Sequence, residues 1–155
     1  MTTIGIDPGK SGGVAWITNG KLCVEKMPET IQDLWKMIDG IAYGSSGLPP
    51  HQSTFGCCKA YIEAVHSSPQ MGVTSAFTFG NGFGHLEMAL TAAGIPFERV
   101  TPQKWQKAMG CLTKGDKNVS KRRAQELFPS IKVTHATADA LLIAEYGYRL
   151  TNSTK

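Results

Sequence analysis

The stretch Thr3-Ile4-Gly5-Ile6-Asp7-Pro8-Gly9-Lys10-Ser11-Gly12-Gly13-Val14-Ala15-Trp16-Ile17 decides how the rest of the chain is interpreted. A short apolar run ends on Asp7, a Pro-Gly turn follows, and a second apolar run leads to Asn19-Gly20. Asn-Gly between apolar runs is a strong hairpin signal, so we expect two paired strands with Asp7 at the end of the first. A carboxylate buried there needs compensation of its charge, whereas the alternative is an ordinary Asp that opens a Pro-Gly turn.

The composition bounds the class of protein. The chain has 155 residues, 41% of them hydrophobic and 18% charged, which is typical of one globular domain over 1–155. No apolar run approaches the roughly 18 residues of a membrane span, and no basic-then-apolar leader opens the chain, so we expect a cytoplasmic protein that contacts no membrane. The cysteines match no zinc spacing and are expected to be reduced, structural thiols: Cys23, Cys57, Cys58 and Cys111.

Apolar periodicity and turn residues predict a mixed α/β sheet with helices packed on it. The expected strands are 2–7, 14–18, 21–26, 60–65 and 96–100, and the first three form a meander. The expected helices are 31–41 (capped by Thr30), 73–93, 102–109, 118–128 and 135–150. A Gly-, Ser- and Pro-rich loop is expected over 44–55, and a basic loop over 110–117.

Three acidic residues stand in apolar surroundings. Asp7 ends the first strand, Glu63 lies near the end of a second apolar strand, and Asp139 interrupts the apolar helical run 138–144. Buried acids are normally paired or bound to a metal. If the two strands are neighbours and the last helix packs across them, the carboxylates form an oxygen-rich site that suits Mg²⁺ or Mn²⁺. Two such ions can activate a water and stabilise the leaving oxygen in phosphodiester hydrolysis.

His135 lies four residues before Asp139, a spacing that places both side chains on one helix face. It could be a fourth metal ligand or a proton carrier for the attacking water. The alternative is a histidine in the first turn of the helix with no chemistry.

Half of the chain's 16 basic residues lie between positions 99 and 123, with Asp116 as the only acid among them. They are Arg99, Lys104, Lys107, Lys114, Lys117, Lys121, Arg122 and Arg123. Such a block favours a polyanionic partner, because each neutralised phosphate releases counterions, and the alternative is a solvated charged face. Contacts of this kind position DNA without reading its sequence.

The first half of the expected 73–93 helix alternates phenylalanines with glycines. Phe77, Phe79 and Phe83 are interleaved with Gly80, Gly82 and Gly84. Glycine costs about 1 kcal/mol in a helix interior, so these positions indicate a close approach by another helix, a second subunit or a phosphate backbone.

Six ordered blocks resemble the RuvC-type Holliday junction resolvases of the RNase H-like superfamily. They are Gly-Ile-Asp-Pro-Gly-x-Ser-Gly-Gly at 5–13, Ile-Glu-x-Val-His at 62–66, Pro-Gln-x-Gly-Val-x-Ser at 69–75, Phe-x-Phe-Gly at 77–80, Gly-Ile-Pro-Phe at 94–97 followed by Pro-Gln-Lys-Trp at 102–105, and Ala-Asp-Ala-Leu-Leu-Ile-Ala-Glu-Tyr-Gly at 138–147. The closer match is to phage-type RuvC-like endonucleases, which implies a phage or prophage origin and the host cytoplasm. The resemblance implies an RNase H-like fold, a mixed five-stranded sheet flanked by helices.

The resemblance also implies a homodimeric crossover junction endodeoxyribonuclease of DNA recombination and repair. It would depend on Mg²⁺ or Mn²⁺ and nick two strands of a four-way junction symmetrically, leaving 5′-phosphates. Its metal ligands, in a two-metal site, map onto Asp7, Glu63 and Asp139, with His135 as the expected fourth member. The expected DNA-binding residues are Lys117 above all, then Lys114, Lys121, Arg122, Lys104 and Lys107. The expected dimer interface is Phe77, Gly80, Phe83 and Gly84, with ordinary packing on the sheet as the alternative.

One position departs from the family pattern. The family usually carries a fourth ligand three or four residues before the last Asp, most often an acid and in some members a His. Here these positions hold Ala136 and His135. Because imidazole is a poor ligand for Mg²⁺, we expect a shift of metal preference towards Mn²⁺.

Three other functions are compatible with parts of this pattern. Actin-like ATPases also open with an apolar strand, an Asp and a Gly-rich hairpin, but they need a second lobe that 155 residues do not supply. A related nuclease acting on forks, flaps or RNA–DNA hybrids would keep the same carboxylates and differ in its loops and dimer. A non-catalytic junction-binding protein is the third alternative, and the three intact acids favour an enzyme.

Overall fold

The computed structural model describes residues 1–46, 57–113 and 115–153. The strands are β1 (Thr2–Asp7), β2 (Gly13–Thr18), β3 (Lys21–Lys26), β4 (Cys58–Glu63) and β5 (Phe97–Val100). The helices are α1 (Ile31–Ser46), α2 (Val73–Ala92), α3 (Pro102–Met109), α4 (Lys117–Leu127) and α5 (His135–Asn152).

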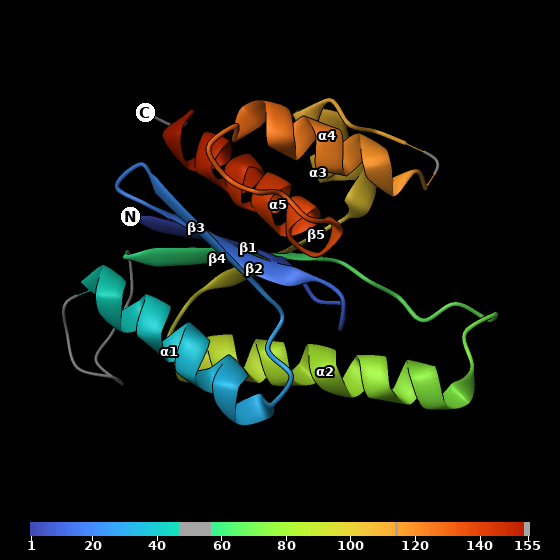
Figure 1. Cartoon of the computed structure of the whole chain (residues 1–155). Helices are drawn as coiled ribbons and strands as arrows, with labels where there is room; N and C mark the ends of the chain where they lie inside the picture. The colour runs from blue at the N-terminus through green and yellow to red at the C-terminus, as the bar shows by residue number, and fades with distance from the viewer. Residues whose placement is uncertain (47–56, 114, 154–155) are drawn as a thin grey trace.

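The expected mixed five-stranded sheet flanked by helices is confirmed. The strand order is β3-β2-β1-β4-β5, with β1, β2 and β3 antiparallel and β4 and β5 parallel to β1. Helices α1 and α2 cover one face of the sheet, and α3, α4 and α5 cover the other (Figure 1). The expected hairpin turn is present, because Asn19 and Gly20 both have positive φ, at 50° and 78°.

Helix α5 lies directly against the backbone of the sheet. A Cβ at Gly5 of β1 would overlap the backbone of α5 at Ala140 and Ala144, and a Cβ at Gly13 would press on the Ala136 carbonyl. The neighbouring residues Ile4 and Ile6 point to the opposite face, where they join the core under α1 and α2. Because side chains alternate between the two faces along β1, Ile4 and Ile6 lie on one face, and Gly5, which has no side chain, faces α5.

Several element boundaries differ from the sequence-based expectation. Helix α1 continues five residues past the expected end, so the loop predicted from 44 is wrong for 44–46, and 47–56 lie outside the described residues. The apolar face continues through Ile38 and Ile41, which are buried, and this outweighs the helix-breaking tendency of Gly40 and Gly44. Strand β4 begins and ends two residues early, because pairing with β1 starts at Cys58. The other boundaries agree within two residues.

Two further expectations concern the cysteines and the membrane. All four cysteines are free thiols, and Cys58 and Cys111 are buried, as expected for structural residues. In the described part of the chain, no helix combines the length and apolarity that a membrane crossing requires.

The contact at Gly5 predicts a large stability difference between two Gly→Ala substitutions. Gly5→Ala places a methyl group into backbone atoms that cannot rotate away, so we expect unfolding free energy to fall by about 1–3 kcal/mol or more. Gly40→Ala on α1 meets nothing within 4 Å and should raise it by about 0.5–1 kcal/mol. Urea denaturation measures both, and equal stability of the two variants would contradict the packing described here.

Candidate active site

Asp7 and Glu63 end two adjacent parallel strands. Ile6 of β1 is in register with Ile62 of β4, so the next residue on each strand is one of these two carboxylates. Both strands end at the same edge of the sheet, because they run in the same direction. The sequence predicted that Asp7 and Glu63 meet if their strands are neighbours, and β1 and β4 are neighbours.

Helix α5 brings the third carboxylate to the same edge. Its first turn is fixed by Thr134, whose amide donates to Thr137 Oγ1 at 3.0 Å. Asp139 follows one turn later, and its charge helps to raise the pKa of Asp7. His135 is exposed at the helix start and interacts with Asp139. The structure thus places Asp7, Glu63 and Asp139 at one edge of the sheet, with His135 one turn before Asp139 on α5.

The three carboxylates have unusual acidities. Burial, followed by the charge of Asp139, raises the pKa of Asp7 from 3.8 to about 6. Burial, followed by the charge of Asp7, raises the pKa of Glu63 from 4.5 to about 7. Burial also raises the pKa of Asp139. Groups of like charge in a partly dry site need a cation, and this is the chemical character of a divalent metal site.

Among the described residues, Lys117 is the cation that acts on all three carboxylates. Its ammonium lowers the pKa of Asp7, Glu63 and Asp139 alike, against the larger effect of burial. Asp116 caps α4 by accepting the Asn118 amide at 2.9 Å, and this cap makes Lys117 the first residue of the helix. Among the described lysines that the sequence predicted to bind DNA, Lys117 is therefore the one beside the three carboxylates.

Two residues that were not among the predicted site residues form hydrogen bonds to the acids. The indole N–H of Trp105 donates to Glu63 Oε1 at 3.0 Å, and the hydroxyl of Ser120 hydrogen-bonds the Asp139 carboxylate. The Pro-Gln-Lys-Trp block contains the tryptophan, but its role could not be read from the sequence. A signal for Ser120 does exist, because it and Ala124, four residues apart, are small residues in a helix of charged ones and form its buried face.

The glycines after β1 make room for Asp7. The Gly9 amide donates to Asp7 Oδ1 at 3.3 Å, and a Cβ at Gly12 would overlap the Asp7 carboxylate and its carbonyl. A side chain at position 12 would therefore displace the acid. The Gly9 hydrogen bond is that of an Asx turn, so Asp7 opens the turn and also carries a largely buried carboxylate beside the other acids.

The donor set fits a hard divalent cation, although the ligands are not drawn together. Among the described residues, no three acidic, histidine or cysteine side chains form a ready-made metal cage. Asp139 Oδ1 is buried and has no hydrogen-bond partner within that part of the chain. A buried carboxylate oxygen without a donor, next to two further carboxylates of which Asp7 raises the pKa of Glu63, matches the oxygen ligands that Mg²⁺ and Mn²⁺ use. Asp7, Glu63, Asp139 and His135 are the residues that could hold such ions.

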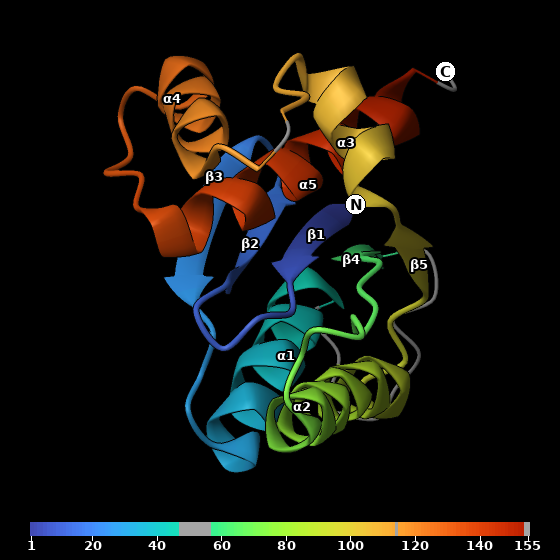
Figure 2. The ribbon, with the colours of Figure 1, turned by 90° about the vertical axis from the view of Figure 1, so that its right-hand side faces the viewer.

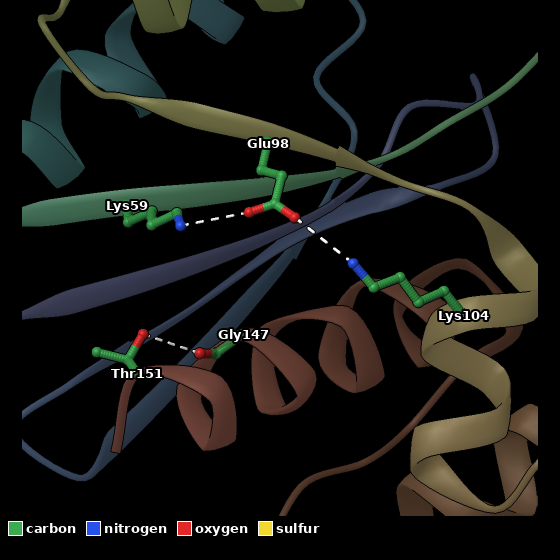
Figure 3. A network of polar contacts seen from close by, with 5 residues as sticks. All are labelled: Lys59, Glu98, Lys104, Gly147 and Thr151. Atoms are coloured by element: carbon green, nitrogen blue, oxygen red, sulfur yellow. Dashed lines mark hydrogen bonds and ion pairs between the residues drawn. The ribbon is translucent and has the colours of Figure 1, made fainter. Parts of the chain in front are cut away.

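The structure separates the members of the basic block. Arg99 pairs with Glu87, and Arg123 donates to the Met109 carbonyl at 2.8 Å, so these two are structural. Lys104 reaches Glu98 at 3.8 Å, and Glu98 also binds Lys59 at the β5 edge (Figure 3). The remaining expected DNA contacts lie on α3 and α4: Lys107 and Arg122 are exposed, Lys121 is half-buried, and Lys114 lies outside the described residues. These helices flank α5 on one face of the sheet (Figure 2).

The residues predicted for a dimer interface divide between two faces of α2. Phe77, with 75% of its surface exposed, shares an open stripe with Gly80 and Gly84, at which an added Cβ would meet nothing within 4 Å. Phe83 lies elsewhere, half-buried against the core under α1 and α2, with the Arg99 guanidinium 5.2 Å from its ring centre. Its packing on the sheet matches the alternative interpretation.

Comparison with known proteins identifies the fold. The sequence matches no protein-family model and no curated protein. The structure is similar to that of Thermus thermophilus RuvC, with a TM-score of 0.62 and 19% identity over 99% of this chain and 97% of that one. The fold is RuvC-like. T. thermophilus RuvC in complex with a Holliday junction substrate gives a TM-score of 0.61 and 18% identity over 99% and 96% of the two chains.

The raised pKa values of the acids predict how stability depends on pH without divalent ions. The folded chain keeps the Asp7 and Glu63 protons to about pH 6 and 7, whereas the unfolded chain releases them near 3.8 and 4.5. The folded state is therefore favoured at low pH and loses stability as pH rises from about 4 to about 7.

Asp7→Asn removes one of these charges. At pH 8 in EDTA, we expect the variant to be more stable than the wild type by about 1–3 kcal/mol, with the difference vanishing near pH 4. Chemical denaturation at the two pH values measures it, and the exposed Glu29→Gln is the matched control. A wild type that gains stability from pH 4 to 8 would contradict the electrostatics.

Proposed function

We propose that the protein is a metal-dependent, structure-selective DNA endonuclease that resolves four-way (Holliday) junctions by paired symmetric nicks, leaving 5′-phosphates. The observation that carries this proposal is the convergence of Asp7, Glu63 and Asp139 beside Lys117 on a RuvC-like fold. The likeness to RuvC in complex with a Holliday junction substrate supports branched DNA as the partner. The blocks at 69–75 and 94–105 support the phage-type branch of the family, and with it the host cytoplasm.

The chemistry divides among the residues of the site. Asp7, Glu63 and Asp139 would hold two Mg²⁺ or Mn²⁺ ions, which, when bound, supply an activated water and a stabilised leaving oxygen. His135 is exposed next to Asp139, where it can act as a fourth ligand or accept a proton from the water. Lys117, beside the three acids, would bind the phosphate next to the bond that breaks.

The exposed cations of α3 and α4 are suited to the rest of the DNA. Lys107 of α3 and Arg122 of α4 are exposed, Lys121 of α4 is half-buried, and both helices lie on the same side of the sheet as α5. Such residues bind phosphates through charge alone. They orient the branch point relative to the carboxylates without specifying a sequence.

A homodimer would supply the second cut. On α2, Val73, Phe77, Gly80, Gly84 and Met88 follow one another at helical spacing and form an exposed stripe. Val73 is 88% exposed and Met88 is 62% exposed, values that are unusual for apolar side chains on one face. Two such stripes can pack closely through the glycines, which would place two carboxylate sites on one junction.

Cleavage of a set of DNA substrates tests this function. A four-way junction should be cut in preference to linear duplex, fork, flap and RNA–DNA hybrid, with Mn²⁺ at least as effective as Mg²⁺ because of His135. Asp7→Asn and Asp139→Asn should reduce the rate by about 100-fold or more while junction binding, measured without divalent ions, is retained.

The outcomes separate the alternatives. Preference for forks, flaps or hybrids would assign the related nuclease, and binding without cleavage would assign a non-catalytic junction-binding protein. Cleavage that survives Asp7→Asn would show that the proposed assignment of the active site is wrong. Equal rates in the two metals at matched concentrations would remove the expected metal preference.

Glycine substitutions test the dimer. In an isolated chain, Gly80→Ala and Gly84→Ala are unhindered and should stabilise α2 by about 0.5–1 kcal/mol each. Across a close helix pair the added methyl groups separate the helices, so we expect the dimer to weaken by about 1–3 kcal/mol. Sedimentation velocity over a concentration series measures this, with Gly40→Ala on α1 as the control. A wild type that is monomeric at micromolar concentration would refute the dimer and the paired nicks.

A further inference from the structure

Trp105 makes an unusual contact for a buried tryptophan. Its side chain is 0% exposed, and its indole N–H donates to Glu63 Oε1 at 3.0 Å, across 42 positions in the chain. An indole has a single donor, which a buried tryptophan must satisfy. Here the acceptor is a site carboxylate that burial and Asp7 push towards its neutral form, and the indole N–H lowers the pKa of Glu63 against that effect.

The backbone fixes the position of the indole. Glu63 of β4 is in register with Val100 of β5, and the Val100 carbonyl accepts the Ala64 amide at 2.7 Å. Two residues later α3 begins at Pro102, whose ring restricts the first helical turn. Trp105 is reached within that turn, with its amide bonded to the Thr101 carbonyl at 3.3 Å. The donor therefore sits on a rigid support anchored beside its acceptor.

We propose that Trp105 is a positioning residue that holds the Glu63 carboxylate in its metal-binding orientation; this rests on the proposed metal-dependent function. Engaging Oε1 with the indole leaves Oε2 for the cation. Glutamate has one more side-chain torsion than aspartate, so it has more orientations to exclude. Outer hydrogen bonds of this kind orient a ligand and raise metal affinity.

The other two acids are held differently. Asp7 receives the Gly9 amide at 3.3 Å from the turn that follows its own strand, and Asp139 is bonded by Ser120 on α4. Glu63 has the longest side chain of the three, and it receives a hydrogen bond from a rigid aromatic ring at 3.0 Å, shorter than the 3.3 Å bond to Asp7. The contact thus orients the least constrained of the three carboxylates.

The test compares Trp105→Phe with a matched control. Phenylalanine keeps an aromatic ring in the core and removes the N–H. Trp16→Phe makes the same change on β2, where Trp16 packs with the core under α1 and α2, on the face away from α5. We expect Trp105→Phe to weaken Mn²⁺ binding to the metal-free protein about tenfold or more by titration calorimetry, while Trp16→Phe leaves it unchanged. Cleavage by Trp105→Phe should recover at high Mn²⁺, and its metal-free junction affinity should match the wild type.

A second measurement avoids any failure to fold. In the wild type, the Trp105 indole ¹H–¹⁵N resonance, assigned by elimination with Trp16→Phe and Trp35→Phe, should move on titration with Mg²⁺ and in Glu63→Gln. An unchanged resonance, or unchanged Mn²⁺ affinity in folded Trp105→Phe, would make Trp105 a core residue only and overturn the proposal. A wild type that binds Mn²⁺ but cuts no junction would refute the proposed function. The positioning role would then be decided by the Mn²⁺ affinity of Trp105→Phe. A wild type that binds neither metal would refute both.

Discussion

The contact between α5 and β1 at Gly5 is the constraint on which the rest of the structure depends. A side chain at this position would overlap the backbone of α5, so the helix axis can lie close to the strand only because the strand is bare there. The same closeness recurs at Gly147, where an added Cβ would overlap the Tyr61 ring. Since Asp7 and Asp139 extend from these two elements, their separation is set by backbone packing. A site fixed in this way does not rely on flexible side chains to assemble.

That packing works against stability at the site. Three carboxylates in a partly buried region repel one another, and each has a raised pKa as a result of burial and, for Asp7 and Glu63, of a neighbouring acid. Lys117 offsets part of this repulsion, and hydrogen bonds from Trp105 and Ser120 offset more. The remaining imbalance is what a divalent cation would relieve. Under the proposed function, unfavourable charge in the folded chain and affinity for metal would thus have the same physical origin.

Local signals were sufficient for much of the fold and for the acids. The Asn19-Gly20 turn and the apolar runs before and after it specified β1, β2 and β3, and a charge within an apolar run singled out Asp139. Long-range pairing was not accessible: β4 starts at Cys58 because β1 pairs with it, and Trp105 meets Glu63 across 42 positions. Helix α1 continues past Gly40 and Gly44 because burial of its apolar face outweighs the low helix propensity of glycine. The approach of Lys117 to all three acids depends on how α4 lies on α5, which no local pattern encodes.

The order of the acids along the chain has a consequence for synthesis. Asp7 is on the first strand, Glu63 on the fourth, and Asp139 on α5, the last of the described helices. A ribosome has therefore made nearly all of these elements before the third carboxylate emerges. Under the proposed function, a polypeptide released before α5 is made lacks the third carboxylate of its active site. Under this proposal the site is complete only when translation has delivered α5 and that helix has docked on the sheet.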